Sequence, residues 1–186
     1  MTAENEQTAL TTAQELGQTV HPSALIQKVK LLIGDEDVVP CLKQVAVERG
    51  CRHYLGAFTP PRHVPPKLAQ LTDEELAIAL CVGELTYDPT NIRIAAEMLS
   101  ATTCNIKRLA ELATEEHCEN IVGYIAKCGQ RVEPNTAAWQ EILNRIGRIT
   151  DPPPGVLPHW TRFVSATGIT PRGGGPHVQW LRPRHT

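Results

Sequence analysis

The chain has 186 residues, of which 41% are hydrophobic and only 4% aromatic, and its formal net charge is −2. This length suits one domain with tails, and Ala, Leu, Ile and Val must supply the packing, which favours helices over a β-sandwich. The balanced charge excludes any argument for a strongly acidic or basic partner from composition alone.

The first 20 residues are rich in Thr, Gln and Glu and lack the basic start and apolar stretch of a secretory signal. We expect residues 1–20 to form a disordered tail. No apolar run reaches the ~20 residues of a membrane-spanning helix. We therefore expect a cytoplasmic protein without a membrane partner, in which the six cysteines are thiols.

Residues 21–147 carry the pattern of a helical domain. Apolar side chains at helical spacing predict helices over 22–33 and 38–49, and four prolines in 59–66 predict a stiff extended connector. Thr72 and Glu75 form a capping-box pattern that opens a helix over 73–82, and Asp88 with Pro89 opens the next. Further helices are expected over 106–114, 118–128 and from 133 to 146, with Gly129 and Gly147 as stop signals.

Residues 148–186 differ in composition, with seven of the fifteen prolines and five of the thirteen glycines. The fragments 160–165 and 177–181 could pair as a β-hairpin, and an irregular arm lying over the helices is the alternative. We expect Trp160 to pack on the last helix near Trp139 or Ile142, and Trp180 either to dock similarly or to be offered to a partner.

A twelve-residue pattern occurs twice, at 45–56 and 112–123, with Ala, Glu, Cys and Gly in common. The offset of 67 residues is about two periods of a 33-residue helical repeat. The second copy resembles the ankyrin helical hairpin in its Leu112-Ala113 pair, its Ile121-Val122 pair and its closing Gly129. The resemblance covers residues 42–132 at most, lacks the Thr-Pro-Leu-His turn, and implies a protein-binding face without catalytic residues.

The repeat positions Cys51, Cys118, Glu48 and Glu115 are candidate structural residues. No cysteine pair has the C-x-x-C spacing of a zinc site, so we expect no metal or cofactor and interpret the cysteines as small apolar side chains at helix contacts. Metal binding and a redox thiol are the alternatives. The two glutamates are expected on a solvated face or in a cap.

Tryptophan, arginine and histidine occur together twice in the C-terminal segment. Such side chains are typical of interface hot spots and of single-strand binders. The candidate partner-binding residues are Trp160, Arg162, Trp180, Arg182 and Arg184.

The sequence therefore predicts an all-α fold, an irregular antiparallel or solenoid-like helical array with a Pro/Gly-rich C-terminal arm over 148–186. The expected function is a non-catalytic module that binds another protein or itself. A nucleic-acid accessory protein that uses its basic C-terminal arm is the first alternative. An enzyme without a recognisable motif is the second.

Overall fold

The computed structural model describes residues 9–51, 64–101, 103–167 and 177–184, and within them the chain is mostly helical. The α-helices are α1 (Thr12–Glu15), α2 (Ala24–Ile33), α3 (Val38–Glu48), α4 (Asp73–Ala79), α5 (Pro89–Leu99), α6 (Ile106–Glu115), α7 (Glu119–Val132) and α8 (Ala137–Ile146). Two 3-10 turns, η2 (Pro66–Gln70) and η3 (Trp160–Arg162), and two strands, β1 (Val164–Thr167) and β2 (His177–Trp180), complete the elements. The all-α prediction is confirmed at the level of helix content, with a small sheet added.

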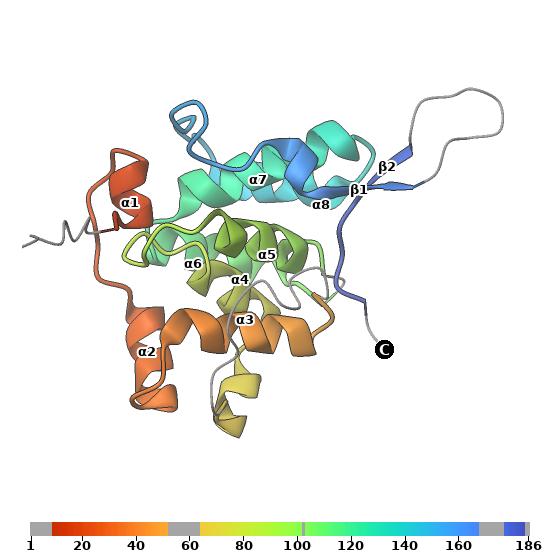
Figure 1. Cartoon of the computed structure of the whole chain (residues 1–186). Helices are drawn as coiled ribbons and strands as arrows, with labels where there is room; N and C mark the ends of the chain where they lie inside the picture. The colour runs from red at the N-terminus through yellow and green to blue at the C-terminus, as the bar shows by residue number, and fades with distance from the viewer. Residues whose placement is uncertain (1–8, 52–63, 102, 168–176, 185–186) are drawn as a thin grey trace, which may run out of the picture.

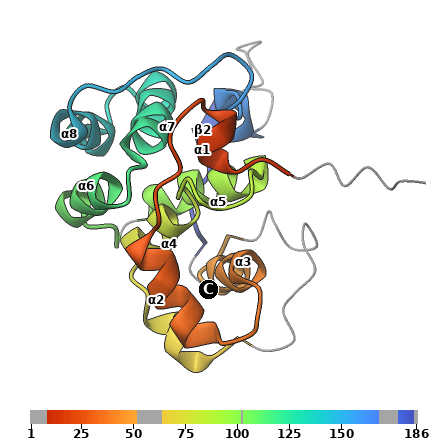
Figure 2. The same cartoon turned by 90° about the vertical axis from the view of Figure 1, so that its left-hand side faces the viewer.

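Helix α4 lies at the centre of the fold (Figures 1 and 2) and packs against α2, α3, α5 and α6, while α8 packs against α6 and α7. The four residues Leu76, Ala77, Ile78 and Ala79 are fully buried, because α4 has neighbours on several sides. In a linear stack of hairpins each unit would contact only the units before and after it.

The helix starts follow local capping chemistry. Thr72 and Glu75 form the predicted capping box of α4, and the Asp88 side chain accepts the Thr90 N–H at 2.8 Å at the start of α5. Helix α2 begins two residues later than predicted, because Ser23 is its N-cap and accepts the Ile26 N–H at 2.9 Å. These bonds satisfy backbone donors that have no partner inside the helix.

The predicted disordered tail over 1–20 is too long. Residues 1–8 lie outside the described part of the chain, but from Leu10 onward the backbone is bonded to the segment after α4. Thr12 and Ala13 donate to the carbonyls of Leu85 and Gly83 at 2.8 and 3.0 Å, and Tyr87 donates to that of Leu10 at 2.9 Å. Ala13 and Leu16 are buried as a result.

The repeated pattern corresponds to one type of helix C-terminus. The Cys51 N–H bonds to the Ala46 carbonyl at 3.0 Å, and the Cys118 N–H bonds to the Ala113 carbonyl at 2.9 Å. The residue before each cysteine has a positive φ, +103° at Gly50 and 54° at His117. Both helices end in a Schellman motif, which places a small buried cysteine against an alanine of the last turn.

The second half of the first copy, and most of the predicted connector over 59–66, lie outside the described residues. Both cysteines at the repeat position are buried: Cys51 is 0% exposed and Cys118 is 2% exposed. Glu48 and Glu115 are exposed, and Glu115 pairs with Arg108 at 3.2 Å. They therefore lie on the solvated face, as predicted.

Gly129 does not end a helix, contrary to the prediction. It lies inside α7, which continues to Val132, and the ring of Trp139 from α8 occupies the space where a side chain at position 129 would lie. A close contact between two helices, and not a turn, requires glycine here.

The two C-terminal fragments for which strands were one alternative do pair. Strands β1 and β2 are antiparallel, with Val164 opposite Trp180 and Ala166 opposite Val178. The sheet extends from the body beside α7 and α8, and the chain after β2 then runs back along α5 toward the end of α3 (Figure 1). Within the described ranges, no helix combines the length and hydrophobicity that crossing a bilayer requires.

Candidate functional site

Trp180 anchors the C-terminal segment to the helical body. Its side chain is only 2% exposed, and its indole Nε1 donates to the Ala96 carbonyl of α5 at 3.1 Å. Its ring centroid lies 4.8 Å from that of Trp139 and 5.4 Å from that of Phe163. A buried indole with a satisfied N–H is a stable anchor, so β2 is fixed against α5 and α8.

Glu133, just after α7, holds the next part of this segment. Its two oxygens accept from the Arg182 guanidinium at 2.8 and 2.5 Å, and Oε2 also accepts from Trp139 Nε1 at 3.4 Å. Burial alone would raise the pKa of Glu133, but the hydrogen bonds and charge of Arg182 outweigh it and lower the pKa below the usual range. The paired carboxylate therefore stays ionised and keeps the segment in place.

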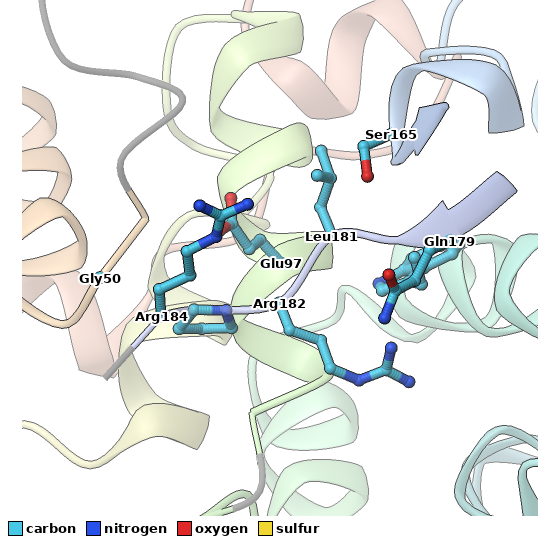
Figure 3. Close-up of a pocket in the computed structure, with 9 residues that line it drawn as sticks. Gly50, Glu97, Ser165, Gln179, Leu181, Arg182 and Arg184 are labelled. Carbon is cyan, nitrogen blue, oxygen red and sulfur yellow. The ribbon is translucent and has the colours of Figure 1, made fainter. Parts of the chain in front are cut away.

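A cavity of about 330 Å³ lies between this segment and α5 (Figure 3). Its polar lining consists of Glu97 from α5, Ser165 and Gln179 from the two strands, and Arg182 and Arg184 from the chain after β2. In Figure 3 the guanidinium of Arg184 points toward the carboxylate of Glu97, whereas the side chain of Arg182 points away from it. The cavity thus presents an acidic and a basic group that lie close together.

Glu97 is the most unusual group in this lining. It is 2% exposed, and its Oε2 has no hydrogen-bond partner among the described residues. Burial raises its pKa to about 7, while the charges of Arg184 and Arg93 act in the opposite direction. A buried carboxyl group with a free oxygen is costly unless something donates to it.

The wall beside Glu97 depends on Gly50 at the end of α3. The Arg184 N–H donates to the Gly50 carbonyl at 3.2 Å, and a Cβ atom at position 50 would collide with the Arg184 backbone. Ser100 holds the chain after β2 as well, because its Oγ donates to the Leu181 carbonyl at 3.0 Å. Contacts from α3 and α5 therefore fix the course of the chain over the cavity.

Trp160 and Arg162 lie elsewhere, whereas Trp180 docks on the helical body, which is the first of the two alternatives expected for it. Trp180, not Trp160, packs against Trp139, while Trp160 is partly buried with the Arg131 guanidinium carbon 5.0 Å from its ring centroid. The prediction for Trp160 is wrong because η3 lies over α7, whereas Trp180 of β2 contacts Trp139 of α8.

Arg162 lines a second cavity of about 620 Å³ with Arg93 and His159. Tyr87 and Tyr124 form part of its wall and donate their hydroxyls to the carbonyls of Val156 and Pro158. None of the described residues that line it is acidic. This surface is the basic region of the described C-terminal segment.

The five predicted partner-binding residues are thus divided between two places. Arg182 and Arg184 line the first cavity with Trp180, and Trp160 and Arg162 belong to the second region. Trp180 is buried in the protein's own core and is not available as a contact residue for a partner. The Arg182 charge is matched by Glu133.

The cysteines have the surroundings of structural thiols. Burial raises the pKa of all six, which keeps them in the unreactive thiol form. Cys51 lies next to the cavity and its Sγ is 3.3 Å from the sulfur of Met98. In the described part of the chain, no group of three or more His, Cys, Asp or Glu side chains has an arrangement that could hold a metal ion.

Sequence reasoning missed Glu97, Glu133, Ser165 and Gln179. One signal for Glu97 was present, since it is the lone acid in the otherwise apolar stretch 94–99. A charged residue in such a stretch of a buried helix has to face either a partner or a cavity. No comparable signal marks the other three, because long-range contacts bring them together.

The chain matches no family model, no curated protein and no solved structure. Function is therefore inferred from the geometry of the chain itself.

Proposed function

We propose that the protein is a non-catalytic interaction module, and that its docking element is the outer edge of strand β1. The single observation that supports this most is that this edge has backbone groups without partners among the described residues. The occupant that we propose is strand β1 of a second copy, which would join the two sheets into one of four strands.

The alternation of hydrogen-bonded and non-hydrogen-bonded pairs in the sheet shows which backbone groups of β1 point outward. The Leu181 N–H donates to the Phe163 carbonyl at 2.9 Å, so that pair is hydrogen-bonded and the next pair along, Val164 with Trp180, is not. The same alternation directs the backbone N–H and C=O groups of Val164 and Ala166 away from β2. Trp180 has the equivalent position on β2, but its backbone N–H bonds to Glu133, so that edge is covered there.

The side chains of β1 favour a second copy of the same strand. Val164, Ser165, Ala166 and Thr167 carry no charge, and no proline interrupts them. In an antiparallel pair about a twofold axis, residue i of one copy faces residue j of the other and j faces i, so a strand made only of small uncharged side chains avoids repulsion. Ala166 is exposed and Val178 beside it is 37% exposed, which offers apolar area at the tip of the sheet.

We also propose an irregular antiparallel helical array and a cytoplasmic location. The many-sided packing of α4 supports an irregular antiparallel array over a linear solenoid. All six cysteines are free thiols, five of them buried and Cys104 partly buried, which agrees with a reducing compartment such as the cytoplasm.

A single proline substitution at this edge tests the proposal. Ala166→Pro removes an outward N–H without removing a bond to β2, so the chain should fold with its usual circular dichroism spectrum and lose self-association. Ala166→Thr keeps the N–H and serves as the matched control. Sedimentation velocity over a range of concentrations should show a dimer for the natural chain and for the control. A monomer at every concentration, or a dimer that persists in Ala166→Pro, would contradict the proposal.

The second cavity supports a second candidate, the nucleic-acid accessory protein. Arg93, Arg162 and His159 line it, and Trp160 lies on the same turn as Arg162. Single-stranded oligothymidylate binding that weakens steeply with salt, and less steeply in Arg162→Ala, would favour this reading. Trp180 and Arg182 would not take part, because one is buried and the other is paired.

A further inference from the structure

We propose that the cavity between α5 and the C-terminal segment is a binding site for a small zwitterion, a free amino acid or a short peptide end that carries an ammonium group and a carboxylate. The ammonium would meet Glu97 and the carboxylate would meet Arg184. This inference does not rest on strand addition at β1, which uses the outward backbone groups of Val164 and Ala166.

The acidic side of the site is built for a donor. The residue Glu97 lines the cavity and is 2% exposed, and its buried Oε2 lacks a hydrogen-bond partner in the described chain. Buried oxygens of this kind are rare in folded proteins, because the lost hydrogen bond to water has to be replaced. A ligand ammonium supplies both hydrogen bonds and the matching charge.

The basic side of the site is Arg184. Its side chain is exposed and makes no ion pair or hydrogen bond with another described residue, while its charge acts on Glu97. Its backbone is held by Gly50 at 3.2 Å, so the guanidinium starts from a fixed point. A guanidinium in this position can bind a carboxylate through two hydrogen bonds.

The remaining polar lining and the size agree with this ligand class. Ser165 and Gln179 add neutral donors and acceptors on the strand side. The volume of about 330 Å³ is too small for a folded partner and suits a small molecule. Arg182, bound to Glu133, would close one side without adding a free charge.

A single cation or a single anion fits the lining less well. An amine without a carboxylate would place its charge beside Arg184, and a carboxylate without an amine would leave Glu97 Oε2 without a donor. Both costs are electrostatic or hydrogen-bonding penalties inside a partly closed site. The pairing of opposite charges in one cavity is therefore the observation that selects a zwitterion.

The test uses the full chain and free L-amino acids as probes. Each is titrated by calorimetry up to about 10 mM, a range that detects millimolar dissociation constants. We expect at least one to bind at a 1:1 ratio. Its carboxamide, which has no carboxylate, and its N-acetyl derivative, which has no ammonium, should each bind at least about tenfold more weakly.

Two variants locate the site. Glu97→Gln keeps the size of the side chain, and Arg184→Gln alters an exposed side chain while keeping its backbone bond to Gly50, so both should fold. Each should weaken the best amino acid by about tenfold or more, and Arg162→Gln, which lies in the other cavity, should leave its affinity unchanged.

Several results would overturn the proposal. One is that no amino acid binds. Others are that the carboxamide or the N-acetyl derivative binds as tightly as its parent, which would make the cavity a cation or an anion site. A last one is an affinity that neither Glu97→Gln nor Arg184→Gln changes, which would place the ligand elsewhere.

Discussion

Glu133 holds Arg182 through two hydrogen bonds of 2.8 and 2.5 Å, across 49 positions of sequence. The same carboxylate accepts the indole N–H of Trp139 at 3.4 Å. One side chain after α7 thereby connects the start of α8 with the chain that follows β2. This arrangement explains how a segment rich in proline and glycine keeps a defined course over the helices.

A double-mutant cycle at this pair should therefore give a measurable coupling energy. Glu133→Gln and Arg182→Gln each break a charge-assisted pair whose side chains are 17% and 35% exposed, and we expect a coupling of about 1–2 kcal/mol from urea denaturation. The exposed pair Arg145 and Glu141 on α8 is the matched control, with about 0.3–0.5 kcal/mol. Equal coupling in both cycles would mean that the Glu133 pair is an ordinary surface contact.

Gly129→Ala should destabilise the protein. In an exposed helix interior this change usually stabilises by about 1 kcal/mol, because alanine is the better helix former. Here a Cβ atom would meet the Trp139 ring, and we expect a net loss of about 2 kcal/mol or more from overpacking. Chemical denaturation measures the change.

The matched experiment adds Trp139→Leu to Gly129→Ala. The smaller side chain removes the collision, so the two substitutions together should cost less than the sum of their separate effects. Lys127→Ala, at an exposed position of the same helix, should change stability by less than about 0.5 kcal/mol. A stabilising Gly129→Ala would show that the ring can move away.

Two glycines with positive φ should respond differently to alanine. Gly17 has φ +66° and open space around its Cα, whereas Gly50 has φ +103° and lies against the Arg184 backbone. Gly17→Ala should cost about 1 kcal/mol from backbone strain alone. Gly50→Ala should cost about 3 kcal/mol or more, because a collision is added to the strain.

The effect of Gly50→Ala should also be local. Displacing Arg184 from α3 would loosen the chain after β2, so the indole N–H of Trp180, which is bonded to Ala96, should exchange faster with deuterium by NMR. In Gly17→Ala its exchange should change only as global stability changes. Unaltered exchange in both variants would mean that the contact of Arg184 with Gly50 does not hold the segment.

Local signals explain most of what could be predicted from the sequence. The caps at Thr72 and Asp88 involve atoms two or three residues apart, so their pattern is visible in the chain. The recurrence at Cys51 and Cys118 reflects a C-terminal hydrogen-bond pattern that is also local. Such features depend little on the rest of the fold.

Long-range contacts account for the rest. Gly129 has the sequence signature of a helix end, but a ring ten residues away requires it inside α7. The choice of Trp180 over Trp160 as the partner of Trp139 depends on where β2 lies, which no local pattern specifies. The cavity combines α3, α5 and both strands, so its polar lining could not be assembled from spacing.

The free energy of unfolding should depend on pH through Glu97. Its pKa rises from an ordinary value of 4.5 to about 7 in the folded protein, mainly because of burial. Between these values the folded state holds a proton that the unfolded state has released, so stability falls as pH rises from about 4.5 to 7 and is level above that. The expected change from this one group is up to about 3 kcal/mol.

Glu97→Gln isolates this contribution from that of other titrating groups. The amide cannot ionise, so the variant should become more stable relative to the natural chain as the pH rises from about 5 to about 7.5. This range covers most of the interval between the two pKa values of Glu97. Arg184→Gln removes a charge that lowers the pKa of Glu97, so the fall in the stability of this variant should extend to higher pH. Parallel pH profiles for the natural chain and Glu97→Gln would show that Glu97 ionises in the folded state as easily as in water.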